Sequence, residues 1–221
     1  MSDLAGFEYV DLPDAWFDER EARFEPLAVQ LRAVNDLVIR SEVDDAAAAA
    51  ALEHLRAAAA LLAGAGEAEP GAAGVRFNAS GRASNWGNAA VGRRNAVAPP
   101  LVTEHGEDGV VRARLTLGAA YEGPPGHVHG GVSALLLDHL MGETASQFRR
   151  FTATGTLTLR YVGPLPLGEV ELAGRIVAEE GRKIRVHASI SGGRGVAVEA
   201  DGLFIVPRGE PVVPGVPAEQ R

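Results

Sequence analysis

Apolar side chains recur at helical spacing in the first third of the chain. Between residues 15 and 63 this pattern predicts two helices, the second of which is an alanine-rich run. Ser41 and Asp44 resemble a capping box ahead of the second helix, and Gly64 is its expected stop. Because alanine offers little apolar surface, we expect this helix to make no strong core alone.

The composition changes after the second helix. Residues 64–95 are rich in glycine, alanine, asparagine, serine and arginine, which indicates a connector that crosses a surface rather than a packed element. We expect Trp86 to hold this connector against the rest of the protein. Residues 1–95 are therefore predicted to form a helical extension with a connector.

From residue 96 onward the hydrophobic period shortens to two. Apolar residues alternate with arginine and threonine over residues 110–118, which predicts a strand. The segment HGEDG at 105–109 is a turn signal before it. We expect the preceding LVTEH and this strand to form a hairpin.

A leucine-rich segment, residues 131–148, is predicted to be the apolar helix of this half of the chain. A sheet with one apolar face needs a covering element, and this helix can supply it. We therefore predict an α+β fold in which one long central helix is wrapped by a curved antiparallel sheet, with residues 208–221 as a flexible tail. The strands expected after the helix are 156–163, 168–181, 182–193 and 195–207.

Composition excludes several classes of protein. The net charge of -8 and the pI near 5.3 argue against general nucleic-acid binding, because such a surface repels phosphates. The chain has no cysteine, which excludes disulfides and thiolate nucleophiles and is compatible with a reducing compartment. The N-terminus lacks a secretory pattern, and Glu53, His54 and Arg56 interrupt the longest apolar stretch. We expect a cytoplasmic protein that binds neither nucleic acid nor membranes.

One acid stands inside the leucine-rich helix. Asp138 would lose its water if this helix is buried, and a carboxylate without water or a partner is costly. The alternative is that Asp138 lies on a solvated stripe of an amphipathic helix. Gly130 and Gly131 at the helix entrance favour a functional site, because glycines let a ligand reach backbone N–H groups.

The segment GPPGHVHGG at residues 123–131, followed by Asp138 in the helix, resembles the PaaI-type acyl-CoA thioesterases of the hot-dog superfamily. TATGTLTLRYVGPLPLGE at 152–169, with its Tyr-x-x-Pro, and EEGRKIRV at 179–186 are also similar to that family. The resemblance covers residues 96–207. It implies the hot-dog fold and hydrolysis of a thioester, with coenzyme A as part of the substrate and no separate cofactor.

The resemblance also assigns roles to residues. It implies Asp138 as general base or nucleophile and a glycine amide of the turn, Gly130 by position, as the oxyanion donor. A threonine at the start of the next strand often belongs to this site and falls on Thr154, with Thr156 as the alternative. Residues two apart in a strand share a face, so we expect both threonines to point the same way. Where one branch of the family has an asparagine, this chain has Gly123.

Coenzyme A carries phosphates, so an acidic protein needs local cations to bind it. Candidates are Arg160 on the strand after the helix, and Arg182 with Lys183 in the following hairpin. An alternative of equal weight is that these are only solvated charges at strand edges.

Two histidines precede the helix. The spacing of His127 and His129 would suit a zinc ligand pair in a strand, but a glycine-rich turn gives them no fixed geometry, so we expect no metal. We interpret His129 as an organiser of the turn and His127 as a candidate substrate contact. Two other functions stay open: a hot-dog hydratase or dehydratase that uses one of these histidines, and a non-catalytic acyl-CoA-binding module.

The spacing of Gly130 and Asp138 bears on assembly. They lie eight residues apart, which separates their backbones by about 12 Å in a helix. One thioester carbonyl has to lie within about 3 Å of both the oxyanion donor and the attacking group. We therefore predict a homodimer in which each site combines Gly130 of one subunit with Asp138 of the other, and we leave open whether two dimers associate.

Overall fold

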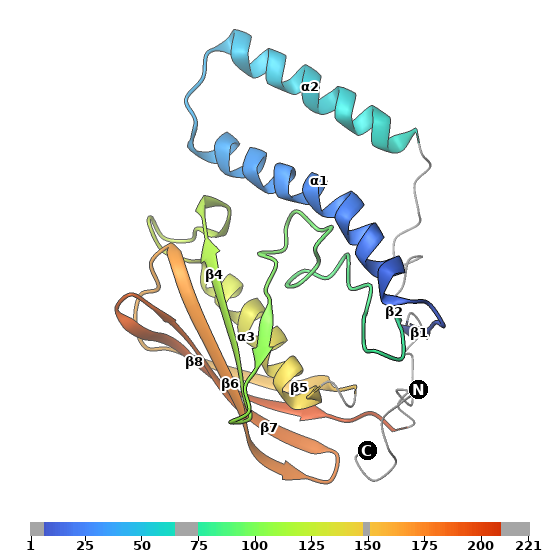
Figure 1. The fold of residues 1–221 in the computed structure, drawn as a ribbon. Helices are drawn as coiled ribbons and strands as arrows, with labels where there is room; N and C mark the ends of the chain where they lie inside the picture. The colour runs from blue at the N-terminus through green and yellow to red at the C-terminus, as the bar shows by residue number, and fades with distance from the viewer. Residues whose placement is uncertain (1–6, 65–74, 148–150, 209–221) are drawn as a thin grey trace.

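The computed structural model describes residues 7–64, 75–147 and 151–208 (Figure 1). Part of the expected connector and the predicted tail beyond residue 208 lie outside these ranges. The helices are α1 (Asp14–Arg40), α2 (Asp45–Ala63), the 3-10 helix η1 (Ala119–Tyr121) and α3 (Gly130–Ser146). The strands are β1 (Phe7–Tyr9), β2 (Val75–Phe77), β3 (Thr103–His105), β4 (Val110–Leu117), β5 (Ala153–Tyr161), β6 (Gly168–Glu180), β7 (Lys183–Gly192) and β8 (Gly195–Ile205).

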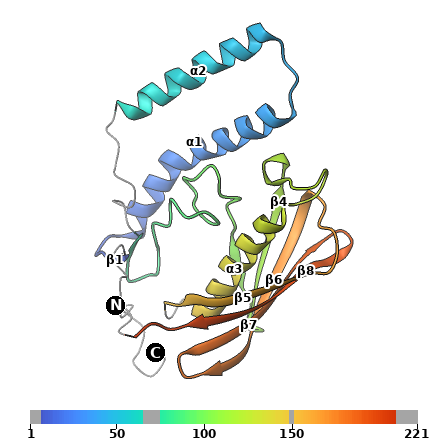
Figure 2. The same ribbon diagram turned by 180° about the vertical axis from the view of Figure 1, so that it is seen from behind.

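Six strands form one antiparallel sheet in the order β3-β4-β6-β7-β8-β5. The sheet bends around α3, which lies along its inner face (Figures 1 and 2). Buried residues of α3, such as Leu136 and Leu140, pack with inward-facing residues of the strands, such as Val170 and Ile184. The predicted α+β architecture, with one helix wrapped by an antiparallel sheet, is confirmed. At one edge of the sheet β5 pairs with β8 and with no other described strand.

Two glycines let α3 approach the sheet closely. A Cβ atom at Gly202 of β8 would lie 2.7 Å from Met141 Cε, and one at Gly174 of β6 would lie 2.9 Å from Thr144 Oγ1. Both distances are shorter than real Cβ contacts, so a residue with a Cβ atom at either position would prevent the helix from packing this close to the strands. The depth of α3, and with it the position of its acid, depends on them.

The two predicted N-terminal helices are confirmed, but they are anchored unequally. Helix α1 buries Phe17 and Ala28, whereas α2 buries no residue. Asp44 caps α2 by accepting a backbone N–H at 2.8 Å. The predicted capping box is nevertheless wrong, because Ser41 lies at the end of α1, where its N–H donates to the Leu37 carbonyl.

By length and composition alone, α2 is the one described helix that could cross a membrane. Its surface carries a charged pair, Glu53 and Arg56, with atoms 2.9 Å apart. The expectation that the protein does not contact membranes stays a prediction.

The connector after α2 contains more structure than its composition predicts. In its described part β2 pairs in parallel with β1, and the sequence did not indicate this two-stranded sheet. Trp86 stacks on Trp16 of α1, and Arg94 lies over the rings of Phe24 and Trp86 at 3.7 and 4.9 Å. These contacts confirm that Trp86 holds the connector, and they identify α1 as its anchor.

Candidate active site

The entrance of α3 is capped by the histidine of the His-Gly-Gly segment. His129 Nδ1 accepts a hydrogen bond from the Gly131 N–H at 3.0 Å. The His129 carbonyl accepts from the N–H groups of Val132 and Ser133 at 2.9 and 3.2 Å. Because Nδ1 is an acceptor here, the neutral ring carries its proton on Nε2. His129 thus binds the backbone of the turn, as expected of a residue that organises it.

This capping leaves one amide of the first turn available. The first four N–H groups of a helix have no acceptor within the helix. His129 takes three of them, and within the described ranges no residue accepts a hydrogen bond from the Gly130 N–H. That amide lies at the positive end of the helix dipole, where a negative oxygen is stabilised. Of the two glycines at the helix entrance, Gly131 donates its N–H to His129, whereas the N–H of Gly130, the predicted oxyanion donor, is available to a substrate oxygen.

The turn that contains His129 is held by η1, which in turn packs against helix α1 of the N-terminal extension. The Tyr121 carbonyl accepts the His129 N–H at 2.9 Å, and Tyr121 Oη donates to the Val97 carbonyl at 3.3 Å. Burial raises the pKa of Tyr121, so its phenol stays protonated and able to donate. Helix α1 packs against η1, which contains Tyr121. Helix α1 of the extension therefore supports, through η1, the loop that leads to the helix entrance.

The acid of α3 meets a threonine of β5. Thr154 Oγ1 donates a hydrogen bond to Asp138 Oδ1 at 2.9 Å. Asp138 is partly buried, so it is neither stripped of water nor on a fully solvated face. The Thr154 oxygen can still accept a hydrogen bond from water. The pair can therefore hold a water molecule beside a carboxylate, as general-base catalysis requires.

A β-bulge separates the two candidate threonines. Thr154 pairs with Phe204 and Thr156 pairs with Leu203, with a register shift at Gly155. Residues paired across antiparallel strands share a face, and Phe204 is buried against the helix. Thr156 instead lines a shallow hollow on the outer face of the sheet with Leu203. The prediction that both threonines point the same way is wrong, because the bulge inserts one residue between them.

The two halves of the predicted site lie at opposite ends of β5. Tyr161, the last residue of β5, donates its Oη to the Gly130 carbonyl at 3.0 Å. Thr154, near the start of the same strand, holds Asp138. An extended strand spans roughly 20 Å over this interval. A single chain therefore does not bring Gly130 and Asp138 to one carbonyl group.

The predicted coenzyme A contacts divide between the same two ends. Arg160 is adjacent to Tyr161 and forms an ion pair with Glu199. Arg182 and Lys183 lie in and next to the turn between β6 and β7, at the end of the sheet where β5 begins. Arg182 donates to a backbone carbonyl at 3.0 Å. No one end of the described chain gathers all three cations.

His127 lies in the turn before α3. Its Nδ1 is 2.9 Å from the Pro125 carbonyl oxygen, and its side chain is partly buried. Among the residues that the structure describes, no three histidine, aspartate or glutamate side chains come together as metal ligands would.

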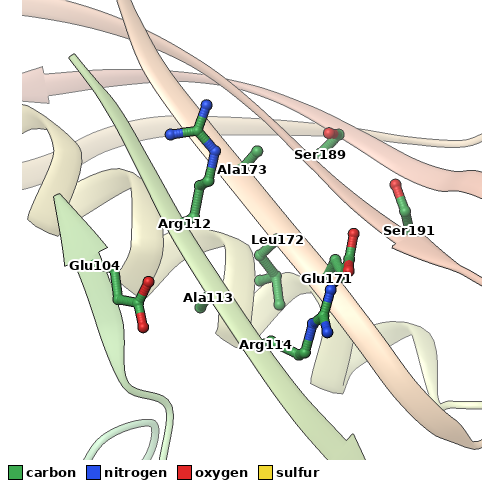
Figure 3. Close-up of a pocket in the computed structure, with 9 residues that line it drawn as sticks. All are labelled: Glu104, Arg112, Ala113, Arg114, Glu171, Leu172, Ala173, Ser189 and Ser191. Atoms are coloured by element: carbon green, nitrogen blue, oxygen red, sulfur yellow. Dashed lines mark hydrogen bonds and ion pairs between the residues drawn. The ribbon is translucent and has the colours of Figure 1, made fainter. Parts of the chain in front are cut away.

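A separate hollow of about 520 Å³ opens on the outer face of the sheet, and Figure 3 shows α3 behind it. Arg114 in this hollow is paired with Glu171, and Arg112 is paired with Asp108. Neither the free glycine amide nor the acid of α3 borders it. The lining residues are Glu104, Arg112, Ala113, Arg114, Glu171, Leu172, Ala173, Ser189 and Ser191.

Sequence reasoning missed the two tyrosines of this site. Tyr161 belongs to the Tyr-x-x-Pro motif, but the motif alone gave it no role. The alternation of β5 places Tyr161 on the face opposite to Arg160, toward α3, and this signal was readable from the sequence. Tyr121 lies between two predicted elements, and its carbonyl contact with His129 has no sequence signal.

Comparisons with known proteins agree with the fold described above. A family model described as "Thioesterase superfamily" matches residues 125–198, which run from the turn before α3 into β8. A crystal structure of a thioesterase superfamily protein is 35% identical to this chain, with a TM-score of 0.71, and the match covers 82% of this chain and 90% of that one. Residues 96–207 make up about half of this chain, so that match also includes part of the N-terminal extension.

Two further relatives are more partial. The acyl-coenzyme A thioesterase THEM4 of Xenopus laevis is 36% identical over 91 residues, which are 40% of this chain and 41% of that protein. The chain therefore aligns with less than half the length of that curated relative. A Bacillus halodurans protein solved with CoA is 26% identical, covers 51% of this chain and 77% of its own, and has a TM-score of 0.46.

Proposed function

This chain belongs to the thioesterase superfamily, and we propose that it hydrolyses acyl-CoA thioesters to a carboxylic acid and free coenzyme A. One observation supports this proposal above all: helix α3 carries both groups that the reaction needs. The Gly130 N–H at its start has no acceptor among the described residues, and Asp138 further along accepts a hydrogen bond from Thr154. The amide suits a developing oxyanion, and the acid with its threonine suits an attacking water.

The reaction follows from these two groups. Asp138 takes a proton from water as the water oxygen adds to the thioester carbonyl carbon. The carbonyl oxygen becomes negative and accepts a hydrogen bond from the Gly130 N–H. The carbon–sulfur bond then breaks, and the coenzyme A thiolate takes the proton from Asp138. In the alternative route Asp138 attacks the carbonyl carbon directly, the carbon–sulfur bond breaks and coenzyme A leaves as the thiolate. Water then cleaves the resulting anhydride, which releases the carboxylic acid, restores the Asp138 carboxylate and provides the proton that the thiolate takes up.

The site is proposed to be shared between two subunits. The edge of β5 that pairs with no other described strand can pair with the same edge of a second copy. In an antiparallel pair centred near Leu157, Tyr161 of one subunit lies opposite Thr154 of the partner subunit. This pairing brings Gly130 of one subunit beside Asp138 of the other and generates two equivalent sites.

The same pairing gathers the predicted coenzyme A contacts. Arg160 lies at the Tyr161 end of β5, whereas Arg182 and Lys183 lie at the end of the sheet where β5 begins. Antiparallel pairing of two β5 edges places Arg160 of one subunit near the Arg182–Lys183 turn of the other. These cations would face the phosphates of coenzyme A in a protein whose net charge is -8.

A panel of acyl-CoA substrates with a thiol-reactive dye tests this function. The wild-type protein should release free coenzyme A, and Asp138→Asn should lower turnover by at least about 100-fold because it removes the base. Asp45→Asn is the matched control, because Asp45 is exposed on α2, and it should behave as wild type.

Two results would contradict the proposal. An altered acyl group with no released thiol would indicate a hydratase or dehydratase. Acyl-CoA binding without turnover would indicate a non-catalytic module.

A further inference from the structure

We infer that Tyr161 is a positioning residue that holds the oxyanion hole in shape, an inference that rests on the proposed function. Its Oη donates to the Gly130 carbonyl at 3.0 Å. The same peptide unit donates its N–H, which belongs to Gly131, to His129 Nδ1 at 3.0 Å. The Gly130–Gly131 peptide is therefore held at both its oxygen and its nitrogen, and we call this arrangement the peptide clamp.

The clamp compensates for the flexibility of its own sequence. Glycine has access to more backbone conformations than any other residue, and here two glycines stand in succession at a helix entrance. A free amide in such a segment would sample several directions. The Gly130 N–H belongs to the preceding His129–Gly130 peptide, whose carbonyl accepts from Val132 and Ser133. The clamp fixes the peptide on the other side of the Gly130 Cα, so the two planes together keep the donor in place before the charge develops.

The ring of Tyr161 also explains why residue 130 is glycine. A Cβ atom at Gly130 would lie 3.2 Å from Cε1 and Oη of Tyr161, and 3.3 Å from its Cζ. These distances are tighter than most Cβ contacts, so a larger residue would push the ring away. Gly130 therefore gives room to the tyrosine as well as to a substrate.

The hydrogen bonds of the clamp reinforce one another. Donation to the Gly130 carbonyl polarises the peptide, which makes the Gly131 N–H a stronger donor to His129. His129 is held from its other side by the Tyr121 carbonyl, which accepts its N–H at 2.9 Å. The turn that carries the free amide is thus fixed between a tyrosine hydroxyl of β5 and a tyrosine carbonyl of η1.

One strand orients both halves of the chemistry. At its start β5 supplies Thr154, which bonds Asp138, and at its end it supplies Tyr161, which bonds Gly130. In the proposed dimer these two ends meet across the subunit boundary. Tyr161 therefore acts through the Gly130 peptide and adjoins the site without being required to touch substrate.

The kinetic test is Tyr161→Phe, which keeps the ring and removes only the hydroxyl. We expect kcat to fall about fivefold to tenfold, the effect of one lost neutral hydrogen bond, with KM changed less than about twofold. Tyr9→Phe is the matched control, because Tyr9 is exposed on β1, and its kcat should stay unchanged.

A spectroscopic test detects the hydrogen bond of the clamp through the chemical shift of the Gly130 carbonyl carbon and does not depend on enzyme activity. The chain contains two Gly-Gly pairs, Gly130–Gly131 and Gly192–Gly193. Protein labelled with ¹³C-carbonyl and ¹⁵N glycine therefore gives two peaks in an HNCO spectrum, and Gly193→Ala assigns them. Loss of the tyrosine hydroxyl should move the Gly130 carbonyl upfield, while the Gly192 carbonyl stays as an internal reference.

The two readouts together decide the inference. A shifted Gly130 carbonyl with reduced kcat and unchanged KM supports it. An unmoved carbonyl, or a shifted carbonyl with wild-type kcat, overturns it. If the wild-type protein releases no coenzyme A from any substrate, the proposed function fails and the catalytic use of the clamp with it, whereas the carbonyl shift still shows whether the clamp forms.

Discussion

Replacing Thr154 tests most sharply whether the β-bulge in β5 directs this threonine, and not Thr156, toward Asp138. Thr154→Val keeps the shape and removes the hydroxyl that donates to Asp138 at 2.9 Å. Thr156→Val makes the same change two residues away, on the far side of the bulge. The regular strand expected from the sequence would expose both hydroxyls to the site, whereas the bulged strand exposes one.

The size of the effect follows from the bond that is lost. A hydrogen bond to a charged group contributes about 1.5–3 kcal/mol, and each 1.36 kcal/mol changes a rate about tenfold. Thr154 is exposed and Asp138 is only partly buried, so water screens the bond and the lower end applies. We expect Thr154→Val to lower kcat by about tenfold and Thr154→Ser to restore most of it.

The assay is release of free coenzyme A at saturating acyl-CoA, followed with a thiol-reactive dye. Thr156→Val should match the wild type in kcat and KM, because its hydroxyl lies on the outer face of the sheet. The reverse pattern, a defect in Thr156→Val with normal turnover in Thr154→Val, would refute the assignment of the bulge and of the Asp138 partner.

Two further predictions concern stability. Gly202→Ala should lower the free energy of unfolding by about 1–3 kcal/mol in urea titrations, because its Cβ would lie 2.7 Å from Met141 Cε. Gly193→Ala is the control, because its Cβ would meet nothing within 4 Å, and it should change the free energy of unfolding little. Equal values for the two variants would contradict the close packing of α3 on Gly202. A hydrogen bond from Arg112 lowers the pKa of Asp108 to about 2 from its usual 3.8, so the stabilisation it gives is present above pH 4 and is lost as the pH falls toward 2. Asp108→Asn should therefore unfold at lower urea than the wild type at pH 6, and this difference should shrink as the pH falls from 4 through 2. A difference that grows at acid pH would count against this ion pair.

The architecture was predictable because its signals are local and repeated. The alternation in β4 and the leucine run of α3 each specify an element over many residues, and glycine turns separate β6, β7 and β8. The pairing of β1 with β2 was not predictable, because it joins two segments of three residues that are far apart in the chain. Pairs of this kind depend on α1 and Trp86, which hold the connector in place.

The site was predicted as a set of residues but not as a geometry. Asp138, Gly130 and Thr154 were found from the motif and its spacing. The bulge at Gly155 was not, because a single glycine in a strand pattern does not say whether the ladder loses its register there. The role of Tyr161 was missed for a related reason: its partner is a backbone carbonyl, and backbone acceptors leave no trace in a sequence.

The central claim is that each site takes its oxyanion donor from one subunit and its acid from the other. Gly130→Pro disables the oxyanion half of the site, because proline has no N–H and its Cβ would also push the Tyr161 ring away, while the first position of a helix tolerates the proline backbone. The second variant, Asp138→Asn, removes the acid. Each variant alone should be nearly inactive.

Mixing the two inactive variants under conditions that exchange subunits is the most direct measurement. In a heterodimer one site carries both lesions and the other carries none. Random exchange makes half of the dimers mixed, so we predict recovery of about one quarter of the wild-type specific activity. A mixture that exchanges subunits and stays inactive would contradict the shared site.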